Sequence, residues 1–151
     1  MEKIWLKSYP PGIPAEIDVD EFRSLGDLFE RSVARYADKT AYHCMGKSIT
    51  YAELDALSAR FGAWLQGALK LPRGARVALM MPNVLQYPIA LFGTLRAGYT
   101  VVNVNPLYTA RELEHQFRDS DPAHVLLGTT AAARLEADPS GAGPLRERPW
   151  H

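Results

Sequence analysis

The stretch from Arg76 to Phe117, RVALMMPNVLQYPIALFGTLRAGYTVVNVNPLYTARELEHQF, decides the fold of this chain. Two continuous apolar runs within it, Val77–Met81 and Thr100–Val104, are typical of parallel strands that are covered on both faces. Each run is followed by a segment with helical spacing, so the stretch predicts strand, helix, strand, helix in that order. We therefore expect right-handed crossovers between parallel strands.

Four segments carry the sequence signature of a helix start. In each, a short polar residue stands three positions before an acidic or amide residue, so that the two can satisfy each other's free backbone amides. The four pairs are Ser24 with Asp27, Thr50 with Glu53, Asn83 with Gln86, and Thr109 with Glu112. We expect a helix to begin at each of these places.

The apolar residues after each start repeat at intervals of three and four, as one face of a helix does. The first helix carries Leu25, Leu28, Phe29, Val33 and Tyr36; the second carries Leu54, Leu57, Phe61, Trp64, Leu65 and Ala68; the fourth carries Leu113 and Phe117. The other face of the second helix is polar, which indicates that this helix lies on a surface.

The third predicted helix is apolar nearly all round, which indicates burial on both sides. Its apolar residues are Val84, Leu85, Ile89, Leu91, Phe92 and Leu95. Pro88 lies five positions past the expected cap Asn83, where a proline removes a backbone hydrogen bond. We therefore expect a kink in this helix or a late start.

A hairpin is predicted between the first two helices, because Thr40–Met45 and Ser48–Thr50 flank Gly46-Lys47, which suits a two-residue turn with glycine first. A further apolar run, His124–Leu127, adds another parallel strand. The fold class that follows is α/β: part of a doubly wound, mainly parallel sheet with flanking helices and an antiparallel hairpin.

The pattern weakens after Leu127. From Ala137 the chain reads ADPSGAGPLRERPWH, which has no periodicity. We expect residues 129–151 to be either a disordered terminal tail or the end of a longer protein that has been cut short or read out of frame.

Composition excludes several classes of protein. Lys plus Arg (17) balances Asp plus Glu (17), and this argues against a nucleic-acid scaffold, which needs a basic surface. Cys44 is the sole cysteine, so no internal disulfide can form and a reducing compartment is indicated. The apolar run before Lys7 is too short for the core of a secretory signal.

One segment has the length of a membrane span. Val77–Leu95 holds 19 residues without a charge. Two prolines, an asparagine and a glutamine interrupt it, so we favour a buried strand followed by a buried helix.

Two glycine or turn segments invite comparison with nucleotide-binding loops. Gly128-Thr129-Thr130 lacks the further glycines and the lysine that a phosphate cradle needs. Pro82-Asn83-Val84, after the first parallel strand, is not the glycine fingerprint of a dinucleotide site. We expect neither segment to bind phosphate.

His43 and Cys44 are neighbours that suggest a thiol with its base. Neighbours in a strand point to opposite faces, so the two cannot hydrogen-bond, and we favour a buried structural cysteine.

Glu112, His115 and Asp119 share one face of the fourth helix and could present a metal site. Arg111 and Arg118 are interleaved with them, which is typical of a solvated face, and we favour that interpretation. The residues therefore give a fold and no active site.

Three segments carry a family resemblance: MGKSITYAELDALS, ALMMPNVLQYPIALFGTLRAG and VVNVNPLYTARELEHQFRDS. They resemble the N-terminal region of bacterial long-chain fatty-acid–CoA ligases, members of the adenylate-forming superfamily. The Ile49–Leu54 and Leu95–Gly98 segments are shared widely across that superfamily, whereas Val101–Gln116 points to the fatty-acyl branch. The resemblance covers residues 1–128, which it implies are the N-terminal part of the AMP-binding domain.

The resemblance implies a two-step reaction in the full-length family. A fatty acid is activated with ATP to an acyl-adenylate, and coenzyme A then displaces AMP to give acyl-CoA. It also implies Mg²⁺, a cytoplasmic location with possible peripheral contact with the inner membrane, a possible homodimer, and no nucleic-acid partner.

The family's functional residues lie in a Ser/Thr/Gly-rich loop ending in Pro-Lys-Gly, in a later acidic residue and in a lysine of a C-terminal domain. None of these motifs occurs in residues 1–151, so we name no catalytic, cofactor-binding or metal-binding residue. The leading interpretation is a ligase fragment that is inactive alone and binds none of the cofactors. The alternatives are a small self-contained α/β module that binds an acyl chain or a protein, and a membrane-facing protein that uses Val77–Leu95.

Overall fold

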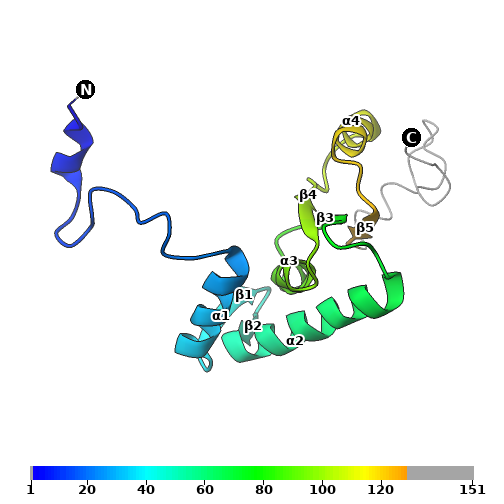
Figure 1. Ribbon diagram of the computed structural model, residues 1–151, viewed down its shortest axis with the longest axis horizontal. Coiled ribbons are helices and arrows are strands. Elements are labelled where there is room, and N and C mark those ends of the chain that lie inside the picture. The colour runs from blue at the N-terminus through cyan, green and yellow to red at the C-terminus, as the bar shows by residue number, and fades with distance from the viewer. Residues whose placement is uncertain (1, 129–151) are drawn as a thin grey trace.

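The computed structural model describes residues 2–128, and the interpretation of residues 129–151 lies outside that range. Figure 1 shows the order of the elements along the chain. They are the 3-10 helix η1 (Ile4–Ser8), α1 (Leu25–Tyr36), β1 (Thr40–Cys44), β2 (Lys47–Thr50), α2 (Tyr51–Trp64), the π-helical turn η2 (Leu65–Leu69), β3 (Arg76–Met80), α3 (Gln86–Arg96), β4 (Thr100–Asn103), α4 (Ala110–Ser120) and β5 (His124–Leu127).

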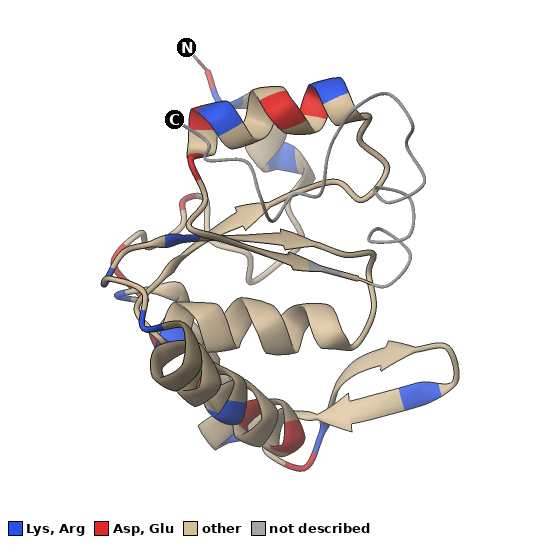
Figure 2. Cartoon of the chain, turned by 90° about the vertical axis from the view of Figure 1, so that its right-hand side faces the viewer, with Lys and Arg blue, Asp and Glu red and all other residues tan. Residues whose placement is uncertain are grey.

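A three-stranded parallel sheet forms the centre of the molecule, with the strand order β4-β3-β5. The middle strand is buried on both faces because its residues alternate between two cores. Val77 and Leu79 pack with residues of α3 and η2, whereas Ala78 and Met80 pack with Leu113 and Phe117 of α4. Figure 2 shows α3 and α4 on opposite faces of the sheet, which confirms the doubly wound prediction.

The uncharged stretch Val77–Leu95 folds as most of β3 followed by most of α3, as predicted. Within residues 2–128, the helices fall short of the length and apolar character that a bilayer crossing requires.

Three of the four predicted helix starts are confirmed. Thr50 and Thr109 form complete capping boxes with Glu53 and Glu112. Ser24 accepts a hydrogen bond from the amide of Asp27, but the Asp27 carboxylate accepts from the amide of Arg23 rather than from that of Ser24.

The predicted cap at Asn83 is wrong, because α3 begins at Gln86 and has no side-chain cap. Pro88 explains the late start that we expected. It occupies the third position of α3, in the first turn, where backbone amides have no partner within the helix and a proline loses nothing.

The contact between α2 and α3 runs through small residues. A Cβ atom added to Gly62 would lie 2.8 Å from the carbonyl oxygen of Gly93, and one added to Gly93 would lie 2.8 Å from the carbonyl oxygen of Ser58. Such distances mean that the two helix backbones touch, which any larger side chain at either glycine would prevent. Helix α3 lies between the sheet and α2, but it buries Pro88, Ala90, Gly93 and Thr94. The six apolar residues predicted to be covered are only half-buried, so the prediction of burial on both sides holds for the helix position and is wrong for those side chains.

This contact corrects the predicted face of α2. The residues that α2 and the following turn bury are Leu54, Ser58, Gly62 and Leu65. Trp64 is 47% exposed and Ala68 is exposed, although both belong to the predicted apolar face. The prediction placed the large apolar side chains of α2 against the core. The backbone of α3 comes so close to α2 that small residues, Ser58 and Gly62, occupy the contact instead.

A group of side chains ties α1 to the other helices. Arg96, at the end of α3, donates to the Asp55 carboxylate (2.6 Å) and to the Ser58 hydroxyl (3.0 Å) on α2. Its guanidinium lies over the ring of Phe29 on α1, and Phe29 stacks on Phe92 of α3 with the ring centroids 4.1 Å apart. Phe29 is thereby fully buried, but Leu25, also placed on the predicted face of α1, is 61% exposed.

The predicted hairpin is present, but its turn lies one residue earlier than expected. Cys44 pairs with Lys47, so the turn residues are Met45 and Gly46, not Gly46 and Lys47. Both turn residues have positive φ angles (49° and 73°), which is the type I′ geometry that matches the twist of paired strands.

We predict that Gly93→Ala will lower the free energy of unfolding by about 1–3 kcal/mol, the usual cost of overpacking a tight contact. The new methyl group would meet the Ser58 carbonyl and the Phe61 ring, which lie 2.8 and 2.7 Å away. Chemical denaturation measures the loss. Gly67→Ala is the matched control, because no atom lies within 4 Å of its added Cβ. Equal stability of the two variants would contradict a close α2–α3 contact.

Candidate functional site

The carboxyl ends of the three parallel strands meet at one edge of the sheet, which we call the carboxyl edge. It comprises the residues that follow β3, β4 and β5: Met81–Pro82, Val104–Asn105 and Gly128. Open α/β sheets bind their ligands outside this edge, so it is the candidate region of the fold.

A hydrogen-bond network at Asn103 joins three elements at this edge. The Tyr87 hydroxyl on α3 donates to the side-chain oxygen of Asn103 (2.8 Å), and the Gln116 amide on α4 donates to the backbone oxygen of Asn103 (2.9 Å). Sequence reasoning missed this network, since its members are far apart in the chain and follow no periodic pattern. It fixes the end of β4 between the two helices that cover the sheet.

Gly128 follows β5 directly and remains bonded to β3. Its amide donates to the carbonyl of Met80 (3.0 Å), and a Cβ added to it would lie 3.3 Å from the Cβ of Met81. That amide is therefore not turned toward a phosphate, while Thr129 and Thr130 lie outside the described residues. In the turn after β3, the Val84 amide donates to the Pro82 carbonyl (2.8 Å).

His43 and Cys44 have different partners, as the strand geometry predicts. The His43 Nδ1 atom lies 2.8 Å from the Ser48 hydroxyl, and the Cys44 thiol donates to the Asn83 carbonyl at 3.5 Å. The prediction of a buried cysteine is wrong, because Cys44 is half-buried. A two-stranded hairpin covers its own side chains only in part.

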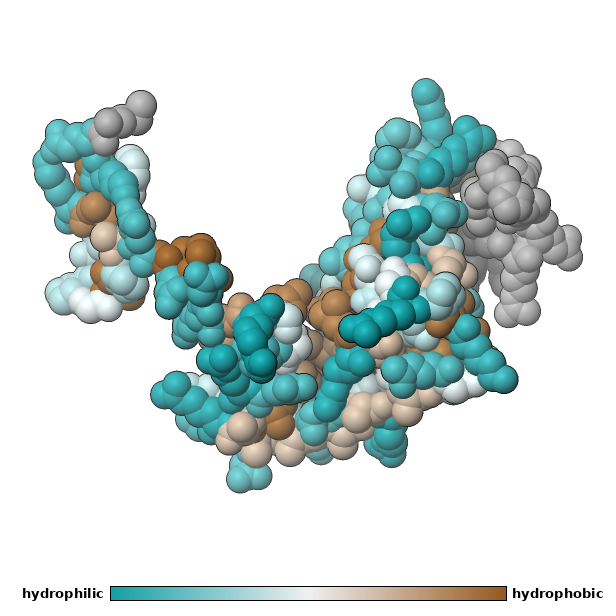
Figure 3. All heavy atoms as spheres, in the orientation of Figure 1, coloured by the Kyte–Doolittle hydropathy of each residue, from teal (hydrophilic) through white to brown (hydrophobic). Residues whose placement is uncertain are grey.

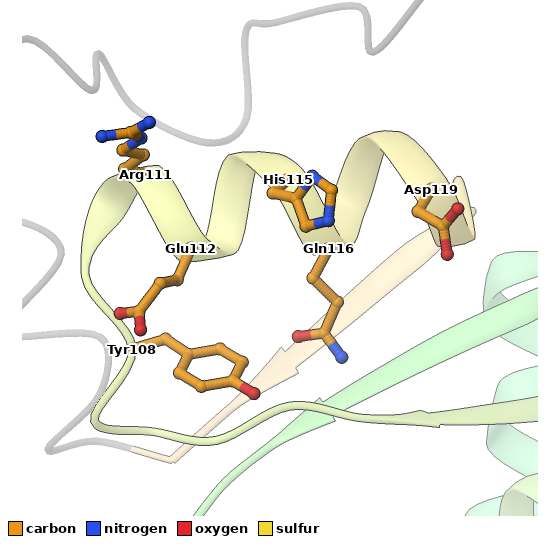
Figure 4. A pocket seen from close by; sticks show the side chains of 6 residues that line it. All are labelled: Tyr108, Arg111, Glu112, His115, Gln116 and Asp119. Atoms are coloured by element: carbon orange, nitrogen blue, oxygen red, sulfur yellow. The ribbon is translucent and has the colours of Figure 1, made fainter.

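The predicted polar face of α4 lines an open groove of about 470 Å³ (Figure 4). The groove is lined by Tyr108, Arg111, Glu112, His115, Gln116 and Asp119. The Glu112 carboxylate is held by the capping box, where it accepts from the amide and the hydroxyl of Thr109, both at 2.7 Å. His115 and Asp119 are exposed. Across residues 2–128, no three His, Cys, Asp or Glu side chains gather as metal ligands would.

The carboxylates with perturbed pKa values are helix caps. The pKa of Glu112 is lowered by the hydrogen bond from the Thr109 amide and then by that from its hydroxyl; the pKa of Glu53 is lowered in the same way by Thr50. The pKa of Asp27 is lowered chiefly by the Arg23 amide and then by the Arg23 side chain. These lowered pKa values favour the charged form of the three carboxylates, which accept hydrogen bonds at helix starts. Their role is structural, because a catalytic acid has to carry a proton.

Burial raises the pKa of Tyr42, and its neighbours Tyr51 and Tyr87 raise it further. These tyrosines bring the hairpin, the start of α2 and the start of α3 together beside the Asn103 network. The arrangement can hold the hairpin in place; it supplies no nucleophile with a base.

The sequence of the chain is similar to a known enzyme family and to individual ligases. The family model described as "AMP-binding enzyme" matches residues 29–147. The chain is 55% identical over 136 residues to a long-chain-fatty-acid–CoA ligase of Escherichia coli and 56% identical over 136 residues to one of Yersinia pestis. Each alignment covers 90% of this chain and 24% of the relative. The chain thus spans about a quarter of the length of these relatives.

Solved structures share the fold. A Mycobacterium tuberculosis fatty acyl CoA synthetase superposes with a TM-score of 0.68 at 28% identity, over 79% of this chain and 24% of that one. A structure of VinN with L-aspartate superposes with a TM-score of 0.67 at 32% identity, over 74% of this chain and 31% of that one.

We predict that the Thr109–Glu112 capping box makes stability depend on pH. Because the pKa of Glu112 is lower in the folded chain than its ordinary value of 4.5, the unfolded chain binds the proton more readily. The contribution is present above that value and is lost as the pH falls below it. Denaturation midpoints of Glu112→Gln measured from pH 6 to pH 3 will therefore fall less steeply than those of the parent chain.

Glu30→Gln is the control, since Glu30 lies on α1 and its side chain makes no hydrogen bond or ion pair with residues 2–128. If Glu112→Gln and the parent chain show the same pH dependence of stability, the capping box is not its source.

Proposed function

Because the chain belongs to the family of AMP-binding enzymes, we propose that it forms the N-terminal part of a long-chain fatty-acid–CoA ligase. The observation that carries this proposal is the identity of 55% over 136 residues to the Escherichia coli ligase. That similarity reaches well beyond the short motifs that the wider superfamily shares.

The proposed reaction has two steps. The carboxylate of a fatty acid attacks the α-phosphate of ATP, which releases pyrophosphate and forms an acyl-adenylate. The thiol of coenzyme A then attacks the acyl carbon, AMP leaves with the bond electrons, and the thiol proton goes to solvent or a base. ATP and coenzyme A are therefore proposed substrates of the whole protein.

We assign residues 2–128 the role of framework in this enzyme. The two cores around β3 and the Asn103 network hold the strand ends of the carboxyl edge in fixed positions. We assign no Mg²⁺ to residues 2–128, because Mg²⁺ prefers several oxygen ligands around one point and no three His, Cys, Asp or Glu side chains gather in this range. The Glu112 carboxylate is engaged by its cap, so no step of the reaction is assigned to a metal held here.

We propose that the whole protein lies in the cytoplasm, contacts the membrane surface peripherally, and can pair as a homodimer. The support is the resemblance of the chain to long-chain-fatty-acid–CoA ligases.

A segment exchange tests the function. Residues 1–128 replace the corresponding segment of the Escherichia coli ligase, and palmitoyl-CoA formation is measured with ATP, Mg²⁺ and coenzyme A. We expect the chimera to retain activity within about tenfold of the parent, since the two segments are 55% identical and cores tolerate substitutions that keep their pattern and total volume. The same exchange with the Yersinia pestis segment is the control. A folded but inactive chimera beside an active control would refute the assignment.

We predict that the 151-residue chain is inactive by itself. We expect no ATP–pyrophosphate exchange above background with palmitate and Mg²⁺, because the described residues supply no phosphate-binding loop. Incorporation of labelled pyrophosphate into ATP measures this. Sustained exchange by the purified chain would show that it carries a complete site.

A further inference from the structure

The connections that follow β3 and β4 at the carboxyl edge carry no charge. Residues 81–85 and 103–109 include no Lys, Arg, Asp, Glu or His. Figure 2 shows these connections in tan at the arrowhead ends of the strands, whereas charged residues gather on α4 and at the opposite end of the sheet. Figure 3 shows the hydrophilic residues over α4. The carboxyl edge is therefore uncharged where β3 and β4 end.

The backbone amides of these connections are also engaged within the chain. Four of them donate to nearby oxygens: Val84 to the carbonyl of Pro82, Val104 to that of Leu79, Leu107 to the side chain of Asn105, and Tyr108 to the carbonyl of Asn105. A phosphate site needs converging amides or cationic side chains to offset its charge. These four amides are not available for that purpose.

An uncharged edge suits one of the proposed substrates better than the other. Open α/β sheets bind their ligands outside the carboxyl ends of their strands. The triphosphate of ATP would find no cation among residues 81–85 and 103–109. The hydrocarbon chain of a fatty acid needs apolar surroundings and few polar groups, which Met81, Val104 and Leu107 can supply. The acyl chain is therefore the substrate part that fits this edge.

The loop from β4 to α4, residues 104–109, is held at both ends. At its start, Asn103 accepts one hydrogen bond on its side chain from the Tyr87 hydroxyl (2.8 Å) and one on its backbone oxygen from the Gln116 amide (2.9 Å). At its end, Thr109 forms the capping box of α4. These bonds join residues within the described range, so they do not depend on what covers the edge in a longer protein.

We infer that Tyr87 and Gln116 are positioning residues, which hold Asn103 and thereby place the loop 104–109 beside the acyl chain of the fatty acid. This inference rests on the proposed ligase function and names the substrate that the carboxyl edge meets. Both residues act through Asn103 and take part in no chemical step. Loss of either bond will therefore weaken fatty-acid binding and leave ATP binding unchanged.

Steady-state kinetics of the chimera described above test the inference. Tyr87→Phe removes only the hydroxyl, and Gln116→Met replaces the amide donor with a side chain of similar length. Because one hydrogen bond is lost in each case, we expect the KM for palmitate to rise roughly two- to tenfold in each variant. The KM for ATP and kcat will stay within about twofold of the parent chimera, since only substrate binding has changed.

Tyr99→Phe is the matched control. Tyr99 directly precedes β4, at the opposite end of the strand, and its hydroxyl donates to the Leu71 carbonyl (3.2 Å). This variant loses a tyrosine hydrogen bond from a more buried site, so its melting temperature will fall, but its KM for palmitate will match that of the parent. Equal rises for palmitate and ATP, or the same rise in Tyr99→Phe, would reduce the network to a structural role and overturn the inference.

A double-mutant cycle tests the route through Asn103. In the Asn103→Ala background, Tyr87→Phe will cause no further rise in the KM for palmitate, because its acceptor is already absent. Independent effects of the two substitutions would contradict that route. An inactive parent chimera would refute the proposed function, and this inference with it. An active chimera in which Tyr87→Phe keeps the parent KM for palmitate would refute this inference alone.

Discussion

Contact between the backbones of α2 and α3 is the constraint on which the rest of the structure depends. Gly62 and Gly93 leave no side chain between the two helices, and Arg96 reaches across to Asp55 beside them. Since α3 lies on the sheet, this contact also fixes how far α2, the hairpin and α1 stand from β3. Two glycines, Gly62 and Gly93, thus determine how close α2 lies to α3, although they are far apart in the sequence.

Local signals in the sequence predicted the elements well, because each depends on atoms a few residues apart. The capping boxes at Thr50 and Thr109 are examples, as are the apolar runs of β3 and β5. Predictions that needed knowledge of a neighbouring element were less accurate. The exposed Trp64 had the right spacing for a core position, but α3 approaches the small residues of α2 instead. Asn83 is a favourable cap residue, but it does not cap α3. Pro88 occupies the first turn, so the helix begins at Gln86.

The candidate site was harder to predict for a related reason. Sequence reasoning correctly separated His43 from Cys44, since that follows from strand geometry alone. It could not find the Asn103 network, in which Tyr87 bonds the side chain and Gln116 the backbone oxygen of Asn103 because β4 ends between α3 and α4. The proposed function comes from similarity to known ligases. The structure adds the hydrogen bonds at Asn103 and shows that the carboxylates with lowered pKa values serve helix starts.

The register of the sheet has a consequence for how the chain acquires its fold. Val77 pairs with His124, so the central strand waits for a partner that is synthesised much later. During that interval the hairpin and the capped α2 can form from local contacts and β4 can pair with one edge of β3, while the other edge of β3 stays unpaired. Nonlocal parallel pairing of this kind is slow, and nascent chains are open to aggregation until it is complete. The order of the strands therefore sets how long an incomplete chain exposes the unpaired edge of β3.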